Sequence, residues 1–111
     1  MRICDLDTPS LLLDKDIFDQ NLRLMCERAR AAGKLLRPHA KTHKCSRIAK
    51  EQLAAGQCAG VCAAKVSEAL ALLRAGIPSV LITSPVVGKL KIDNLCACLA
   101  TGAECLVVVD N

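Results

Sequence analysis

The sequence predicts an α/β fold in which parallel strands alternate with helices. The candidate strands are continuous apolar runs rather than alternating ones, which is typical of strands that are covered on both faces. The segments between them are amphipathic, with their apolar residues on one helical stripe. Four glycines follow alanine-containing segments at intervals of 23, 20 and 26 residues, and each is expected to end a helix: Gly33, Gly56, Gly76 and Gly102.

The composition agrees with one small globular domain. The chain has 111 residues, of which 52% are hydrophobic and 23% charged, and this balance excludes intrinsic disorder. Phe18 is the one aromatic residue, and there is no Trp or Tyr. The scarcity of aromatic side chains argues against a stacking surface for single-stranded nucleic acid.

The first strand is expected over residues 10–13 (SLLL), and a helix follows it as far as Gly33. Asp14 or Asp16 is expected to cap this helix, because a carboxylate accepts hydrogen bonds from the free N–H groups of a first turn. The apolar stripe of the helix recurs at i, i+4, i+7 and i+11: Phe18, Leu22, Met25 and Ala29.

The rest of the chain repeats this strand-and-helix pattern. Further strands are expected over residues 35–39 (LLRPH), 60–64 (GVCAA), 79–83 (SVLIT) and 105–109 (CLVVV). Ser46 is expected to cap the second helix. The apolar stripes of the last three helices are Ala49 and Leu53, then Val66, Leu70 and Leu73, then Ile92, Leu95 and Leu99.

These units fit either an open doubly wound sheet or a barrel. The glycine-rich motifs that bind nucleotides in open sheets, GxGxxG and GxxxxGK(S/T), follow none of the expected strands. A complete (β/α)8 barrel takes roughly 250 residues, so five strands and four helices make a little over half of one. We expect an α/β fold that is a partial (β/α)8 TIM-type barrel, with about five parallel strands and four helices.

The eight cysteines contain no CxxC pair, so the usual spacing of zinc ribbons and redox dithiols is missing. We interpret them as reduced, small apolar residues, with metal binding and redox sensing as the alternatives. The longest charge-free stretch, residues 75–88, has 14 residues and two prolines, too short for a membrane span. No secretory signal is evident, and we expect a cytoplasmic location.

Positive charge is concentrated in one block. Residues 28–50 hold eight basic residues and no acidic one, whereas the remaining chain holds seven basic and eleven acidic residues. Such a block could bind nucleic acid or the phosphate of a small ligand. The alternative is a solvated helix face.

Catalytic groups of parallel α/β folds gather at the carboxyl ends of the strands, and one such end is rich in reactive side chains. It is the segment RPHAKTHK, which begins at Arg37. His39 and Lys41 are two residues apart and would point to the same side of extended backbone. Like charge from Arg37, Lys44 and Arg47 should lower the pKa of the lysine, as Schiff-base formation near neutral pH requires. The alternative is a solvated basic turn.

The same segment offers a second interpretation. His39, His43 and Cys45 carry the nitrogen and sulfur ligands that zinc prefers, although a fourth ligand is not evident. Side chains at the other strand ends are expected to be helix caps or turn residues: Lys65, Ser67, Thr83, Ser84 and Asp110.

Four segments together resemble the D-serine dehydratase and D-threonine aldolase family: DLDTPSLLLD, RPHAKTHK, AAKVSEALALLRAGI and ITSPVVG. Members of this family are fold-type III pyridoxal-phosphate enzymes with an alanine racemase-type N-terminal domain. The resemblance implies that Lys41 is the catalytic lysine that holds pyridoxal 5'-phosphate as a Schiff base, with His39 beside the cofactor. It implies a D-amino acid substrate, and either deamination or retro-aldol cleavage.

The resemblance also implies an incomplete protein. We expect residues 1–111 to be the N-terminal part of the barrel, without its second half and without the C-terminal β domain of the family. A divalent metal occurs in the full-length family, but its ligands lie near the C-terminus, so no metal residue is assigned here. We expect a lyase fragment that is inactive alone; the alternative is a non-catalytic module that binds the cofactor or completes a barrel. The partners expected are a D-amino acid and a second copy or a complementing chain, with no nucleic acid and no membrane.

Overall fold

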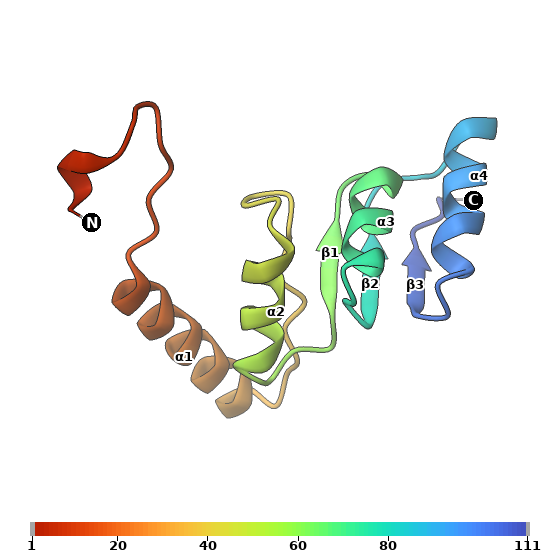
Figure 1. Cartoon of the computed structure of the whole chain (residues 1–111). Coiled ribbons are helices and arrows are strands. Elements are labelled where there is room, and N and C mark those ends of the chain that lie inside the picture. Colours follow the sequence, from red (N-terminus) through yellow and green to blue (C-terminus); the bar gives the residue numbers. More distant parts are fainter. Residues whose placement is uncertain (1, 111) are drawn as a thin grey trace.

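The computed structural model describes residues 2–110 and has an α/β arrangement. The elements follow one another in a row, so that the two termini lie at opposite ends of the molecule (Figure 1). Over the described residues they are a 3-10 turn (Ile3–Asp5), α1 (Lys15–Ala31), α2 (Ser46–Ala54), β1 (Val61–Ala63), α3 (Val66–Arg74), β2 (Ser79–Ile82), α4 (Lys89–Leu99) and β3 (Glu104–Val107).

The three strands form a parallel sheet in the order β1–β2–β3, with α3 and α4 as the two crossover helices. The register places Val61 opposite Val80, and Ser79 opposite Glu104. Both helices lie on the same side of the sheet (Figure 1). Because the three strands are parallel, their carboxyl ends lie at the same edge of the sheet. Functional sites of parallel sheets usually lie at this edge.

The core lies between the sheet and these two helices. Val61 and Ala63 of β1, and Val80 and Ile82 of β2, are completely buried on the helix side. The residues between them, such as Cys62, point to the opposite face because side chains alternate along a strand. We call this opposite side the open face of the sheet. The helices and the loop before α2 close the core with Ala40, Ala49, Ala69, Leu72, Leu73 and Cys98.

The four predicted helices are present. Asp14 caps α1, because its carboxylate accepts the N–H of Ile17 at 3.0 Å. The prediction for Ser46 is wrong: Cys45 occupies the cap position of α2 without a side-chain hydrogen bond, and Ser46 begins the helix. All four glycines predicted to end helices have positive φ: Gly33, Gly56, Gly76 and Gly102.

Two of the five predicted strands are not formed as strands. Residues 10–13 are exposed and unpaired in the described chain, and Leu11 is fully solvent-accessible. Residues 35–39 run beside β1 but form only two isolated bridges, Leu36 with Cys58 and His39 with Cys62. The physical reason in the second case is Pro38, which has no N–H to donate to a regular ladder. The resulting three-stranded sheet with four helices is consistent with part of a barrel.

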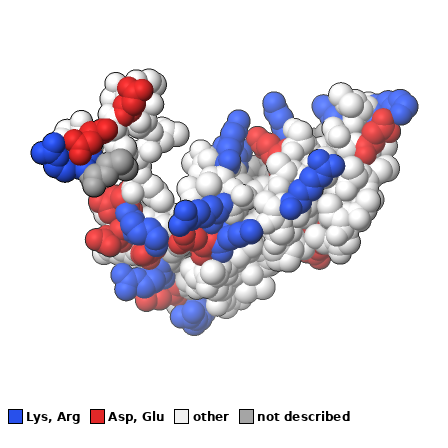
Figure 2. All heavy atoms as spheres, viewed as in Figure 1, with Lys and Arg blue, Asp and Glu red and all other residues white. Residues whose placement is uncertain are grey.

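The basic block of residues 28–50 extends from α1 to α2. On the face shown in Figure 2, basic and acidic side chains are mixed over the part of the molecule that holds these two helices. Charges of both signs interspersed in this way are typical of a solvated surface. As for membranes, none of the helices between residues 2 and 110 combines the length and the apolarity that a bilayer span needs.

Replacement of Ile82 by Ala tests the core. The side chain of Ile82 is completely buried between β2 and the helices, so its truncation should lower the free energy of unfolding by about 2–5 kcal/mol. Urea unfolding followed by circular dichroism measures the change. Leu90→Ala on α4 is the matched control, since Leu90 is 75% exposed and its loss should change stability by less than about 0.5 kcal/mol. Equal effects of the two substitutions would contradict this placement of the core.

Candidate functional site

Three neighbouring chain segments meet at the carboxyl edge of the sheet. The ring of His39 comes from the bridged segment beside β1, and its Nε2 lies 3.2 Å from Oγ1 of Thr83, the residue after β2. The Thr83 hydroxyl donates in turn to the carbonyl of Ala63, the last residue of β1, at 3.2 Å. On the other side of the ring, the backbone N–H of Lys41 donates to Nδ1 of His39 at 3.3 Å.

These contacts fix the protons on the His39 ring. A backbone amide can only donate, so Nδ1 must be the acceptor and carry no proton. Nε2 then carries the hydrogen and donates to Thr83, whose own hydrogen points to the Ala63 carbonyl. Burial lowers the pKa of His39 below its usual value, and the charge of Lys41 acts in the same direction, while Glu68 opposes them. The site thus holds a neutral imidazole in one defined tautomer.

Lys41 is exposed and lies in a turn over residues 40–43, so the prediction of extended backbone from His39 to Lys41 is wrong. The residue before it, Ala40, is buried in the core and donates its N–H to the carbonyl of Cys62 at 2.8 Å. The carbonyl of Ala40 accepts the N–H of Lys44 at 2.8 Å, and this hydrogen bond closes a turn that contains Lys41. Among residues 2–110 the ammonium of Lys41 takes part in no ion pair. The structure therefore presents an exposed lysine, whose backbone N–H is bonded to a neutral imidazole, at the carboxyl edge of a parallel sheet.

The basic residues expected to surround Lys41 are themselves paired with carboxylates. Three ion pairs form: Arg37 with Glu104 at 3.7 Å, Lys44 with Glu68 at 3.8 Å, and Arg47 with Glu51 at 3.9 Å. The guanidinium of Arg37 lies at the amino ends of β2 and β3, where it contacts Ser79 and Glu104, and the charges of Lys44 and Arg47 each have an opposite charge nearby. The positive field around Lys41 is therefore weaker than the count of basic residues suggests.

The possible zinc ligands do not form a cluster. The ring of His43 accepts the N–H of Cys45 at 3.1 Å and lies 3.3 Å from the amide oxygen of Gln52 in α2. His43 is thus directed to α2, whereas His39 is directed to β2. Over the described residues no three His, Cys, Asp or Glu side chains come together as a metal site.

Thr83 is the site residue that sequence reasoning missed, because it was expected to be a turn or cap residue. Its position directly after an apolar strand was the available signal. That signal identifies a strand end, but it does not show which other strand end lies beside it. The order β1–β2 of the folded sheet places Thr83 against His39.

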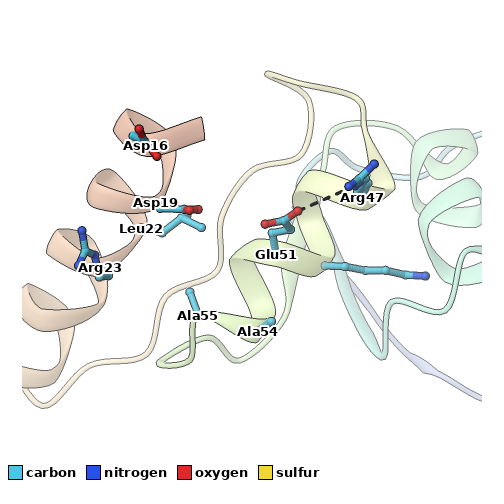
Figure 3. Close-up of a pocket in the computed structure, with 9 residues that line it drawn as sticks. Asp16, Asp19, Leu22, Arg23, Arg47, Glu51, Ala54 and Ala55 are labelled. Carbon is cyan, nitrogen blue, oxygen red and sulfur yellow. Dashed lines mark ion pairs between the residues drawn. The ribbon is translucent and has the colours of Figure 1, made fainter. Parts of the chain in front are cut away.

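A groove of about 920 Å³ lies between α1 and α2 (Figure 3). Asp16, Asp19 and Arg23 line it from α1, and Arg47 and Glu51 line it from α2. Acidic and basic groups alternate there, and Lys15 of α1 is 3.4 Å from Glu51. A groove with compensated charge suits contact between the two helices, and we do not place the functional site in it.

The neutral state of His39 has a consequence for stability. A histidine whose pKa is lowered by folding binds fewer protons in the folded than in the unfolded chain, so its contribution to stability is complete above the unfolded pKa of about 6.5. That contribution should be lost as the pH falls below this value. The NMR titration midpoint of the His39 ring should be lower in the native chain than in urea. Equal midpoints would contradict the partly buried, neutral ring, and His39→Gln identifies the resonance.

The chain was compared with known proteins. It is 50% identical over 105 residues to D-threonine aldolase of an Arthrobacter species, and 43% identical over 107 residues to 3-hydroxy-D-aspartate aldolase of Paracoccus denitrificans. These matches cover 95% and 96% of this chain but only 27% and 28% of the two relatives. The chain thus spans slightly more than a quarter of each relative. No family model matches it.

Solved structures give the same result. The crystal structure of D-threonine aldolase from Filomicrobium marinum matches 98% of the chain with a TM-score of 0.93 and 46% sequence identity. D-threo-3-hydroxyaspartate dehydratase from Delftia sp. HT23 matches 96% with a TM-score of 0.85 and 30% identity. The chain covers 29% and 27% of these two structures. The family predicted from RPHAKTHK and its companion segments is confirmed, and the chain belongs to the family that contains the D-threonine aldolases and the hydroxyaspartate aldolases and dehydratases.

Proposed function

We propose that this chain is the part of a pyridoxal-phosphate-dependent D-amino acid lyase that carries the cofactor-holding lysine, Lys41. The observation that carries the proposal is the position of Lys41, an exposed residue whose backbone N–H donates to the neutral ring of His39 at the carboxyl edge of the sheet. The likeness to D-threonine aldolase and 3-hydroxy-D-aspartate aldolase supports the same assignment.

The residues at this edge fit pyridoxal phosphate. An amine can hold an aldehyde only when it is free to lose its proton, and Lys41 is exposed without an ion pair among the described residues. A neutral His39 offers a flat ring at the same edge without placing a second positive charge beside the amine. When bound, the cofactor supplies an electron sink for negative charge at the α-carbon of an amino acid. The Nζ atom of Lys41 is then the group placed to move the α-proton.

The substrate class follows from what the relatives have in common. D-threonine and 3-hydroxy-D-aspartate, after which two relatives of this chain are named, are both D-amino acids with a hydroxyl group on the β-carbon. We propose a β-hydroxy D-amino acid as the substrate. Both an aldolase, which cleaves the bond between the α- and β-carbons, and a dehydratase, which removes the hydroxyl, occur among the relatives.

We further propose that residues 1–111 form the N-terminal part of a (β/α)8 TIM-type barrel, whose interior would be the open face of the sheet. The exposed side chains at the free edges of the structure support this. Leu106 and Val107 of β3 are about two-fifths exposed, at 40% and 39%, and Leu11 is fully exposed. Further chain, a second copy or a complementing chain would cover these residues, and the 111 residues alone would be inactive. The free thiols of all eight cysteines support a reducing, cytoplasmic location.

A non-catalytic module that completes a barrel with another chain is the second candidate, favoured by the same exposed edges. It differs from the first in needing no reactive amine. A measurement of the reactivity of Lys41 therefore distinguishes the two candidates, whereas a measurement of assembly does not.

Borohydride reduction in the presence of pyridoxal phosphate tests the role of Lys41. The label should be found on the peptide that contains Lys41, and Lys41→Ala should abolish it, because this amine is the one we place at the site. Lys44→Ala is the matched control, three residues away in the same basic segment, and should keep the label. Peptide mass spectrometry measures the position. A label that is spread over several lysines, or that survives Lys41→Ala, would overturn the proposal.

A further inference from the structure

The pairing between residues 36–40 and the β1 segment changes register within a few residues. Leu36 lies opposite Cys58, whereas His39 lies opposite Cys62, so three steps along one segment match four along the other. The extra residue lies on the β1 side, at Ala59–Gly60. The bonds on its two sides are Ala59 N–H to the Leu36 carbonyl at 2.9 Å and Cys62 N–H to the Pro38 carbonyl at 2.7 Å.

Arg37 supplies a donor that Pro38 lacks. In a regular parallel ladder that continued from Leu36, the residue at position 38 would donate its N–H to the carbonyl of Ala59. Proline has no N–H, and the guanidinium of Arg37 donates to that carbonyl instead, through Nη2 at 3.2 Å. The side chain of Arg37 thus satisfies the backbone group that the register change leaves open.

The same guanidinium reaches across the open face to the other strands. Nη1 of Arg37 donates to the Ser79 hydroxyl at 2.8 Å, and that hydroxyl donates to the carboxylate of Glu104. Nη2 lies 3.7 Å from the same carboxylate. The Arg37 side chain is only 20% exposed, so its charge is partly desolvated and its hydrogen bonds are correspondingly strong. Arg37 therefore ties its own segment to β1, β2 and β3 at once.

Gly60 leaves the space for this crossing. A Cβ atom at position 60 would lie 2.4 Å from Nη1 of Arg37 and 2.7 Å from the Ser79 carbonyl oxygen, which no side chain can occupy. The φ angle of Gly60 is +147°, a conformation that residues with a side chain rarely adopt. Glycine is required here for two reasons: the guanidinium of Arg37 occupies the space of a side chain, and the backbone has a positive φ.

The register change decides which side chains face the core. With regular pairing, Ala40 would lie opposite Cys62 and share its open face, and His39 would point to the helices. With the extra residue, His39 lies opposite Cys62 on the open face, and Ala40 is buried in the core at 4% exposure. A shift by one residue exchanges the two faces of a strand, so the extra residue is what directs His39 towards Thr83.

We propose that Arg37 and Gly60 are positioning residues for the candidate site: by holding the extra residue of the β1 segment, they place His39 on the open face at the carboxyl edge, where its ring accepts the backbone N–H of Lys41. The proposal rests on the proposed function for the chemistry of Lys41, but its structural part concerns the register alone. It assigns a role to two residues that have no part in the proposed chemistry of Lys41.

The first test is Arg37→Met in the full 111-residue chain, with Arg47→Met as the matched control. Arg47 belongs to the same basic block but pairs only with Glu51 on the surface. In Arg37→Met we expect amide hydrogen exchange of Ala40 and Cys62 to accelerate by roughly tenfold, because their bonds depend on the register. The titration midpoint of His39 should rise towards its value in urea, and labelling of Lys41 should fall by roughly a hundredfold. Arg47→Met should change none of these.

A second variant keeps the test decisive if Arg37→Met does not fold. Gly60→Ala keeps the guanidinium but forces it off its acceptors, and it should shift the His39 midpoint and the Ala40 exchange in the same direction. Native midpoint and native exchange in a folded variant of either kind would overturn the proposal. If borohydride labels no lysine even in the wild-type chain, the proposed function fails, while the exchange and histidine measurements still decide the role of Arg37 and Gly60.

Discussion

The arrangement of the carboxyl edge depends on one extra residue in the chain that enters β1. It lies opposite Pro38, the residue that cannot donate to a ladder, and its carbonyl is satisfied by the guanidinium of Arg37 at 3.2 Å. Hydrogen bonds from a charged donor contribute about 1.5–3 kcal/mol each, more than a neutral pair. Because Gly60 has no side chain, the guanidinium can pass over it to Ser79. Without this set of contacts, Ala40 could not be in the core while His39 is on the open face.

The electrostatics of the site follow from the same placement. His39 receives the N–H of Lys41 on one nitrogen and donates to Thr83 with the other, so it is held as a neutral ring with a lowered pKa. Arg37 and Lys44 are each close to a carboxylate from a later segment of the chain, Glu104 and Glu68. Lys41 has no such carboxylate among the described residues, a property it shares with Lys34 and Lys50 of the same block. What sets Lys41 apart within the block is its place next to His39, whose ring accepts its backbone N–H.

The fold shows why a chain that spans slightly more than a quarter of its relatives can be recognised by its shape. The chain covers 29% of the D-threonine aldolase structure it resembles, yet its TM-score against that part is 0.93. Each strand-and-helix unit packs mainly against the next one, as β1, α3 and β2 do, so a run of units keeps its local geometry. The leucines of residues 10–13 lack such neighbours among the described residues and are exposed.

Residue periodicity and a few special residues were enough to determine much of this protein from sequence. Apolar stripes and helix-ending glycines predicted the four helices, continuous apolar runs predicted the three paired strands, and RPHAKTHK identified the family and the candidate lysine. The tertiary structure decided the rest: the failure of residues 10–13 to pair, the carboxylates beside the basic residues, the partnership of His39 with Thr83, and the crossing of Arg37 over Gly60. Local patterns fix how a segment is built, but strand neighbours and register depend on contacts between residues more than twenty positions apart, which no local pattern encodes.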